Sequence, residues 1–422
     1  MAKAGSEVPG LPARRAALRL LDGVLRRGET LEQNETAALR GLPAPDAGLA
    51  RAIAAETLRW LVNFDALIDS VTREVLPDDA KSRTVLRLML AQWLRLDTPP
   101  HAVVATALPL LSGGPKRLAH GVFGALTKRG VELPAAPTLP EAVGERWGER
   151  AGAIAGGLAE PPPLDLTLRD PSHTAEWVVK LGADSLMPGH LRLSRGQAVH
   201  GLEGFEDGAW WVQDLAASLP ARLLGDGQGT KGKGRALDLC AAPGGKTLQL
   251  AAQGWQVTAL DISAKRLKLL EENLKRTGLE AEVIAADAFK WEPPTENGAK
   301  FDAILIDAPC TATGTARRHP DVLHRIGPRQ IEQMAEVQAR LIERASGWLT
   351  PGGMLVYAVC SLESDEGEDQ AEKVWLPREP ISAEELPAGL SPTAHGTLRT
   401  DPGMLPEHGG LDGFFIARWR NS

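Results

Sequence analysis

Cysteine is scarce in this chain of 422 residues, which contains only Cys240, Cys310 and Cys360. An odd number of cysteines without a neighbouring pair argues against a disulfide framework. The sequence also lacks a Cys-x-x-Cys pair and a histidine cluster at ligand spacing, so we expect no structural zinc and no other metal. In a reducing compartment the three thiols are therefore available either for packing or for reaction.

Long apolar stretches are missing as well. No run of about 18 apolar residues occurs, so the sequence predicts no membrane span. The opening segment, MAKAGSEVPGLPARRAALRLL, lacks the basic, apolar and cleavage regions of a secretory leader and turns into an amphipathic helix. We therefore expect a soluble cytoplasmic protein, and nothing in the sequence requires an oligomer.

A strong excess of basic charge is also absent, because the formal net charge is −7. Residues 1–135 carry 18 Lys and Arg against 14 Asp and Glu, so the acidic excess lies in the rest of the chain. A mildly basic N-terminal part is compatible with a phosphate-bearing partner, although solvated helix faces would give the same balance.

The chain divides into three regions by pattern. Residues 1–140 read as an all-helical domain, because apolar positions recur at steps of three and four up to the proline-rich VELPAAPTLPEAVG. Residues 141–232 are mixed: LDLTLRD predicts a strand, HTAEWVVKLGA a helix, and WWVQDLAASLPARLLG a strand that runs into a helix. The glycine-rich GDGQGTKGKG predicts a flexible loop before the third region.

Residues 233–422 alternate short apolar runs with amphipathic helices. The predicted strands are RALDLC, VTALDI, AEVIAAD, FDAILIDAP, MLVYAVC and DGFFIARWR. Near-continuous apolar strands between helices indicate a parallel sheet that is covered on both faces. The third region is therefore a doubly wound α/β domain, and its ligand should bind at the carboxyl ends of the strands.

The segment DLCAAPGGKT joins the first of these strands to a helix. Gly244 and Gly245 would let a ligand approach the backbone, and the helix N-terminus would favour negative charge. A P-loop would need glycine where this chain has Cys240, and no Gly-x-Gly-x-x-Gly occurs. Two interpretations remain open, a loop that binds a nucleoside-type ligand and a tight turn between strand and helix.

Acidic residues end three consecutive predicted strands, at Asp261, Asp287 and Asp307. An acid at such a place can accept hydrogen bonds from ribose hydroxyls, although Asp261 or Ser263 would also serve as a helix N-cap. Three acids at one sheet edge suit a ligand with hydroxyls, amines and a positive centre. They suit a triphosphate poorly, because like charges repel.

Two of the cysteines follow strands that we expect to be neighbours. Cys310 comes directly after Asp307-Ala308-Pro309, and Cys360 ends the following strand. Adjacent strand ends meet over one crevice, so these two thiols should converge there. A single buried cysteine is usually a small apolar side chain, and packing with a backbone contact is our interpretation for Cys240.

Four segments together resemble the cytosine-5 RNA methyltransferases of the NOP/Sun family. They are DLCAAPGGKT, LDIS, DAPCTATGTARRHPD and CSLESDEGED. The helical N-terminal part resembles the RNA-binding antitermination factor NusB, and the combination resembles the RsmB/Fmu/Sun subgroup, which modifies small-subunit (16S) ribosomal RNA. The resemblance is strong from about residue 208 to residue 420, and DAPC followed by CS is its most specific part.

This resemblance implies a Rossmann-like methyltransferase domain that uses S-adenosyl-L-methionine and acts on RNA. A thiolate that adds to carbon 6 of cytosine makes carbon 5 nucleophilic toward a methyl sulfonium. Cys360 would be that thiolate, Cys310 would assist product release, and Asp307 would contact the cytosine edge or the cofactor. The implied cofactor site consists of Cys240, Ala241, Ala242, Pro243, Gly244, Gly245, Lys246, Asp261, Asp287 and Asp307.

Arg317, Arg318 and His319 follow Cys310 in a predicted loop and could contact RNA phosphates, although a solvated loop would contain the same residues. The chain departs from the family at Val359, where threonine is common, and near Gly367, where asparagine is frequent. The segment HGVFGALTK of the helical domain lacks an asparagine and an arginine that are usual in the family. The RNA contacts of this domain should therefore differ from those of the family.

Three other functions remain to be compared with this one. A P-loop NTPase would need a glycine at position 240 and a magnesium-binding pair. A non-catalytic RNA-binding assembly factor would keep the fold, but it would not need both Cys310 and Cys360. Cytosine-5 methylation of transfer RNA would use the same residues on another substrate.

Overall fold

The computed structural model describes residues 8–229, 232–294 and 300–421. Its contacts divide the chain into two compact units, a helical unit and a second unit, which we call the catalytic unit because it contains the cysteines predicted to react. The helical unit contains the described residues up to Glu160 together with Arg318–Ile326, and the catalytic unit contains Pro161–Arg317 and the described residues from Gly327 onward.

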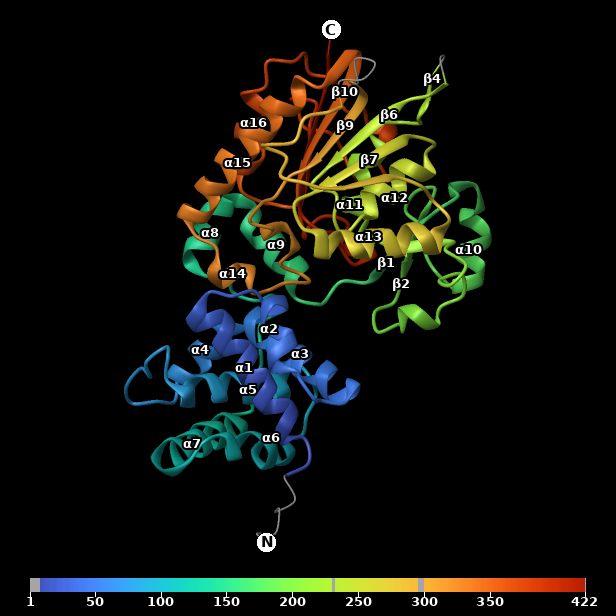
Figure 1. Ribbon diagram of the computed structural model, residues 1–422. Helices are drawn as coiled ribbons and strands as arrows, with labels where there is room; N and C mark the ends of the chain where they lie inside the picture. Colours follow the sequence, from blue (N-terminus) through green and yellow to red (C-terminus); the bar gives the residue numbers. More distant parts are fainter. Residues whose placement is uncertain (1–7, 230–231, 295–299, 422) are drawn as a thin grey trace. The chain divides into compact units, whose positions relative to one another are not determined.

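The helical unit confirms the period of three and four residues in the N-terminal sequence. Its core is formed by apolar faces that include Leu21, Phe64 and Leu88. Local signals set the helix ends: Gly28, at φ 68°, ends the first helix, and a capping box of Thr30 and Gln33 starts the second. The helices are α1 (Leu11–Arg27), α2 (Leu31–Ala38), α3 (Ala44–Arg59), α4 (Leu61–Asp69), α5 (Lys81–Leu94), α6 (Pro100–Ala107), α7 (Gly113–Arg129), α8 (Glu141–Trp147) and α9 (Ala151–Leu158) (Figure 1).

A short helix from much later in the sequence completes this unit. Helix α14 (Val322–Arg325) packs on α1 (Figure 1). The partly buried ring of His324 places Nε2 2.7 Å from the carbonyl oxygen of Leu58, and desolvation lowers the pKa of this histidine. The predicted first region therefore gains a piece that its own sequence does not contain.

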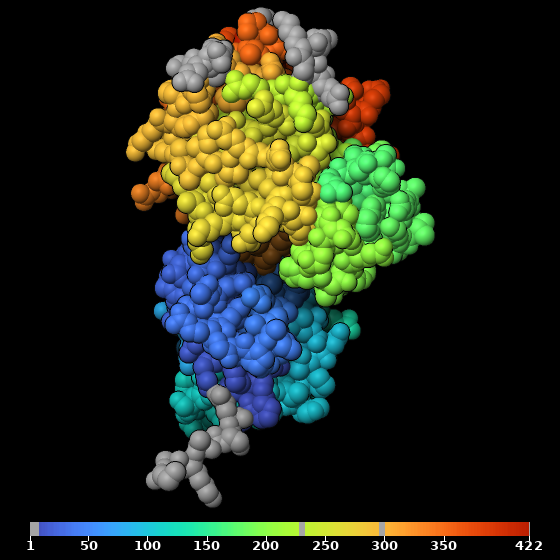
Figure 2. All heavy atoms as spheres, turned by 45° about the vertical axis from the view of Figure 1, so that its right-hand side comes forward, coloured from blue at the N-terminus to red at the C-terminus, as the bar shows by residue number. Residues whose placement is uncertain are grey.

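The catalytic unit begins with a small antiparallel sheet in the order β2-β1-β3. Its strands are β1 (Leu164–Leu168), β2 (His190–Leu193) and β3 (Trp210–Val212), with α10 (Thr174–Leu181) beside them. The buried Arg192 donates twice to Asp165 and also to the carbonyl oxygens of His408 and Gly410, which attaches the small sheet to the C-terminal part of this unit. In Figure 2 these residues form the green lobe beside the yellow α/β body.

The main sheet has the order β11-β12-β10-β9-β6-β7-β8. Strands β6 to β10 are parallel, and β12 pairs antiparallel with β10 and β11. The chain order reverses between β6 and β9, where ligands bind in doubly wound sheets. The strands are β6 (Arg235–Leu239), β7 (Gln256–Asp261), β8 (Glu282–Ala285), β9 (Phe301–Asp307), β10 (Leu349–Val359), β11 (Leu398–Thr400) and β12 (Phe414–Arg420).

Helices cover both faces of this sheet (Figure 1). One face carries α11 (Leu215–Arg222), α12 (Gly245–Ala252) and α13 (Ala264–Thr277), whose leucines pack on the sheet through residues such as Ala236 and Ala259. The other carries α15 (Pro328–Ser346) and α16 (Glu368–Glu372), with Leu341 and Ile342 packed on Ile304. The expected doubly wound α/β architecture is confirmed.

The regions found by contacts differ from those predicted by pattern. The sequence predicted regions of 1–140, 141–232 and 233–422, whereas the contacts place residues 141–160 with the helical unit. The small sheet belongs to the catalytic unit because Arg192 bonds to residues after position 400. The predicted flexible loop before β6 contains a two-stranded hairpin of β4 (Gln228–Gly229) and β5 (Gly232–Lys233). The expectation of no membrane span concerns the helices. Across the described part of the chain, no helix is both long and apolar enough to cross a membrane.

Candidate functional site

The glycine loop follows β6 at the predicted edge of the sheet. Cys240 takes the left-handed conformation at φ 63°, and Gly244 has φ 108° as the N-cap of α12. A Cβ atom at Gly244 would lie 2.4 Å from Cδ1 of Leu270 on α13, so only glycine fits at this position. The loop therefore stays close to α13 and presents the N-terminus of α12.

Asp261 ends β7 and anchors the glycine loop from the side. Its carboxylate accepts hydrogen bonds from the backbone nitrogens of Ala242, at 3.1 Å, and Ser263, at 2.8 Å. Ser263 is the residue that caps α13, because its hydroxyl accepts from the nitrogen of Arg266. Of the two N-cap candidates, the structure thus assigns the cap to Ser263 and leaves Asp261 beside the loop.

The neighbouring strand ends add one apolar and one acidic group. Ile262, directly after Asp261, has 74% of its surface exposed, which is unusual for isoleucine and leaves an apolar contact for a flat ring. Asp287 lies two residues beyond the end of β8 and accepts a hydrogen bond from the nitrogen of Phe289. The sequence analysis did not predict a role for Ile262. The available signal was an apolar residue directly after Asp261, the acid expected to bind ribose hydroxyls.

Lys246 and Asp307 form an ion pair between the glycine loop and β9. The Nζ atom of Lys246 lies 2.7 Å from Oδ2 of Asp307. Burial alone would lower the pKa of Lys246, but the carboxylate of Asp307 outweighs burial and the pKa is raised. A negative charge on Cys360 also raises the pKa of Lys246, which places this ammonium within electrostatic reach of that thiol. In a P-loop this lysine would face a phosphate, whereas here it faces an acid.

The two predicted thiols meet as expected from the strand order. The sulfur atoms of Cys310 and Cys360 lie 3.4 Å apart, and both residues are half-buried. The hydrogen bond to Cys360, followed by burial, raises the pKa of Cys310, so Cys310 remains a protonated thiol at neutral pH. This arrangement provides one sulfur that can donate a hydrogen and one that can receive it.

Two further buried groups lie behind the glycine loop. Burial raises the pKa of Asp238 to about 7; its Oδ2 accepts from the Thr247 hydroxyl at 2.5 Å, and its Oδ1 has no hydrogen-bond partner among the described residues. Burial, with the charges of Asp307 and Asp261, raises the pKa of Cys240 to about 12. Cys240 packs against the sheet core, as the packing interpretation predicts.

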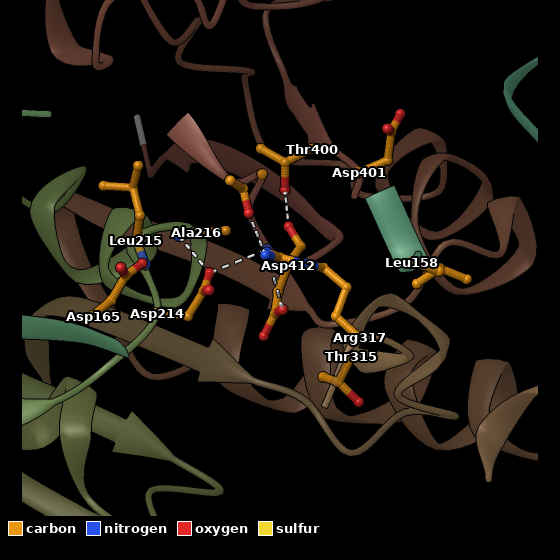
Figure 3. Close-up of polar contacts among 12 residues, drawn as sticks. Leu158, Asp165, Asp214, Leu215, Ala216, Thr315, Arg317, Thr400, Asp401 and Asp412 are labelled. Carbon is orange, nitrogen blue, oxygen red and sulfur yellow. Dashed lines mark hydrogen bonds and ion pairs between the residues drawn. The ribbon is translucent and has the colours of Figure 1, made fainter. Parts of the chain in front are cut away.

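Arg317 does not lie where the sequence led us to expect it. Its side chain is 1% exposed, bonds to the carbonyl oxygen of Gly409, and lies 3.9 Å from Asp412. Figure 3 shows Asp412 held in turn by Asp214, which accepts from its nitrogen at 3.2 Å, and by Thr400. The expected phosphate contact is therefore wrong for Arg317, whose guanidinium is enclosed within the catalytic unit. Arg318 is half-buried and His319 is exposed.

No group of three or more His, Cys, Asp or Glu residues with the geometry of a metal site occurs among residues 8–229, 232–294 and 300–421. The acids of the site point to separate partners instead: Asp261 to the loop backbone and Asp307 to Lys246. The arrangement offers backbone, carboxylate and apolar contacts for a nucleoside-type cofactor beside a pair of thiols.

Comparison with known proteins supports this interpretation. A family model described as 16S rRNA methyltransferase RsmB/F matches residues 230–420, and the NusB family model matches residues 11–113. A methyltransferase homologue from Pyrococcus horikoshii, solved by crystallography, is 26% identical with a TM-score of 0.53 and covers 67% of this chain and 94% of its own.

Two curated relatives match nearly the whole chain, and both are named ribosomal RNA small subunit methyltransferase B. The protein from Xanthomonas campestris pv. campestris is 32% identical and covers 99% of both chains. The protein from Klebsiella pneumoniae subsp. pneumoniae is 33% identical and covers 96% of this chain and 97% of its own. From this coverage and both family models, the chain belongs to the RsmB/F family of 16S rRNA methyltransferases.

Proposed function

We propose that this protein methylates carbon 5 of a cytosine in 16S ribosomal RNA, with S-adenosyl-L-methionine as the methyl donor. The observation that carries the proposal is the contact of the Cys310 and Cys360 sulfurs, 3.4 Å apart, beside the Lys246–Asp307 pair. The names of the relatives support ribosomal RNA of the small subunit as the substrate.

The residues around the glycine loop fit the proposed cofactor. Gly244 lets the loop pack close to α13 and present the N-terminus of α12, and the exposed Ile262 offers an apolar face for an adenine ring. Asp261 lies where ribose hydroxyls are bound in doubly wound folds. Asp287 follows the end of the adjacent strand β8, and Asp307 ends β9. The bound cofactor would supply an electrophilic methyl group on a sulfonium. We propose that the cofactor contacts the loop residues 240–246 and the carboxylates of Asp261, Asp287 and Asp307.

The thiolate of Cys360 adds to carbon 6 of the cytosine, which converts carbon 5 into an enamine-type nucleophile. Lys246 stabilises the negative charge of this thiolate, because the two groups are electrostatically coupled. After carbon 5 has taken the methyl group, its proton passes to a water molecule, the freed electron pair restores the ring double bond, and the bond between sulfur and carbon 6 breaks with its electrons returning to the sulfur of Cys360. Asp307 contacts the cytosine edge, and the protonated Cys310 supplies a hydrogen to the departing sulfur of Cys360.

The target base must leave its stack before it can reach these thiols. Unstacking costs a few kcal/mol, which favours flexible or single-stranded RNA. The NusB-like helical unit serves as a second RNA-binding region, and Arg318 and His319 are the proposed phosphate contacts. The protein works in the cytoplasm, where ribosomal RNA is modified, and the proposal needs no oligomer.

Mapping 5-methylcytosine tests the substrate. Bisulfite sequencing of ribosomal and transfer RNA is compared between a strain that has this gene and a strain that lacks it. In the strain that lacks the gene, we expect one 5-methylcytosine of 16S ribosomal RNA to be lost. A loss confined to transfer RNA would show that transfer RNA is the substrate. Unchanged RNA in both pools would favour a non-catalytic assembly factor.

A second experiment tests the role of Cys310. If Cys310 assists release, Cys310→Ala accumulates a covalent complex of RNA and protein, visible as a retarded band in a denaturing gel. The double variant Cys310→Ala/Cys360→Ala is the matched control and should form no such band. Normal turnover of Cys310→Ala without a band would remove Cys310 from the mechanism.

A further inference from the structure

Glu366 lies in the loop after β10, six positions beyond Cys360, and its side chain is fully buried. The surrounding sequence, LESDEGED, contains several acids, so nothing in the local pattern distinguishes this one. A buried carboxylate is unfavourable unless hydrogen-bond donors surround it. The donors around Glu366 therefore indicate what this side chain does.

Three of these donors belong to the residues that directly follow the two cysteines. The carboxylate accepts from the backbone nitrogen of Thr311, at 2.9 Å, and from its hydroxyl. It also accepts from the hydroxyl of Ser361. Because Thr311 follows Cys310 and Ser361 follows Cys360, one carboxylate bridges the two loops that carry the thiols.

A fourth donor connects helix α15 to the same point. Nε2 of Gln338 lies 3.0 Å from Oε1 of Glu366 and 2.9 Å from the carbonyl oxygen of Pro309, the residue before Cys310. The backbone of Glu366 is held by Tyr357 of β10, whose hydroxyl donates to the carbonyl oxygen of Glu366. The residues on both sides of Cys310 are thus tied, directly or through Gln338, to Glu366.

Backbone contacts bring the two loops together but do not include a charge. The nitrogen of Gly314 donates to the carbonyl oxygen of Cys360 at 3.0 Å, and the nitrogen of Leu362 donates to the Thr313 hydroxyl at 3.0 Å. Burial raises the pKa of Glu366, and the hydrogen bonds from Ser361, Thr311 and Gln338 to its carboxyl group oppose that shift. Glu366 is therefore the acceptor on which donors from both loops converge.

We propose that Glu366 is a positioning residue for the methyl transfer: by accepting hydrogen bonds from Thr311 and Ser361, it keeps the Cys310 and Cys360 thiols in contact. This inference rests on the proposed function. The negative charge of Glu366 also contributes, after the Cys360 contact and burial, to the raised pKa of Cys310. The same carboxylate thus fixes the position of Cys310 and favours its protonated form.

The test is a kinetic comparison of the full-length protein with Glu366→Gln, which keeps the shape but replaces an acceptor oxygen with a donor. Misplacing a reacting group by about 1 Å can cost ~100-fold in rate, so kcat for methyl transfer should fall by ~10- to 100-fold. The KM for S-adenosyl-L-methionine should stay within about twofold, since Glu366 bonds to none of the glycine-loop residues in the described contacts. Glu366→Asp, which keeps the charge, should recover part of kcat.

The control is Asp365→Asn, which removes one charge from the exposed neighbouring residue and should leave kcat unchanged. If Glu366→Gln does not fold, Ser361→Ala carries the test, because it deletes one hydroxyl donor and should lower kcat by ~10-fold. An unchanged kcat in a folded variant, or equal changes in kcat and KM, would overturn the inference. Wild-type protein that transfers no methyl group to cytosine would overturn the proposed function, and this inference with it.

Discussion

The helical and catalytic units both bury charged side chains, but they surround these charges differently. In the helical unit, Arg83 donates to Asp65 and Asp69, and Arg87 forms two hydrogen bonds with Asp65. Both of these buried guanidiniums face acids of their own unit. Such networks hold helices α4 and α5 together and need no ligand.

In the catalytic unit several buried charges gather behind one edge of the main sheet. Asp238 keeps an oxygen without a hydrogen-bond partner in the described structure, and Lys246 pairs with Asp307 within electrostatic reach of the Cys360 thiol. Perturbed titratable groups are frequent at functional sites. The comparison teaches that the surroundings of a buried charge, rather than its burial, separate a structural network from a site. The following variants test this distinction.

The largest effect should follow Cys360→Ala. The rate of methyl transfer should fall by on the order of 10⁴-fold or more, because the group that forms the covalent bond is lost. The assay is transfer of labelled methyl to RNA, with thermal unfolding as a check on the fold. If methyl transfer survives this change, Cys360 is not the nucleophile. The buried charges of Lys246 and Asp307 would then have a structural role only.

The next largest effect should follow Lys246→Met, which removes the ammonium paired with Asp307. Loss of one preorganised electrostatic group typically costs ~10²- to 10³-fold in rate. The matched control is Lys290→Met, because Lys290 lies 3.7 Å from Asp287 but is 84% exposed. Similar losses in both variants would show that the Lys246 pair has no special part in the reaction.

In the helical unit, Asp65→Asn should affect stability rather than chemistry. Removing the partner of two buried guanidiniums costs ~3–5 kcal/mol when the pair is fully buried, and Asp65 is 22% exposed, so we expect about 2 kcal/mol in unfolding free energy. Asp78→Asn is the control, because Asp78 is 89% exposed and should contribute less than ~1 kcal/mol. Denaturant unfolding measures both, and a lower kcat at saturating RNA for Asp65→Asn would contradict the comparison.

An effect of similar size, confined to a pH window, concerns the pH dependence of stability. The pKa of Asp238 is raised from 3.8 to about 7, so its folded form retains a proton that the unfolded form releases. Its stabilising contribution is complete below about pH 4 and is lost as the pH rises toward 7, by roughly 2 kcal/mol between pH 5 and pH 7. Asp238→Asn should flatten this decline in unfolding experiments. Asp226→Asn, at an exposed position of the same unit, should leave it unchanged.

Much of the fold could be predicted because apolar periodicity is a local signal. The alternation of strands and helices after residue 233 and the helical period before residue 130 are both confirmed. Strand β11 was missed, because three residues, LRT, are too short for a pattern to form. The place of the small sheet was also missed, since it depends on bonds from Arg192 to residues more than two hundred positions away.

The site could be predicted as far as strand ends determine it. The meeting of Cys310 and Cys360 followed from strand order and is confirmed. Arg317 was misassigned, because a run of basic residues looks solvated until its distant partner Asp412 is known. Glu366 was missed for the opposite reason: it stands among other acids, and only the packing of Thr311, Ser361 and Gln338 around it distinguishes it.

Helix α14 has a consequence for how this chain is made. The helical unit is synthesised first, but its last component, Arg318–Ile326, lies more than three quarters of the way along the 422 residues. Domains usually fold as units during synthesis, with the N-terminal one first. Here the site on Leu58 that receives His324 stays open until β6 to β9 have already left the ribosome. We therefore expect the early helices to remain incompletely packed during synthesis until Arg318–Ile326 has been made. A fragment that ends at Glu160 should lack the segment that completes this packing.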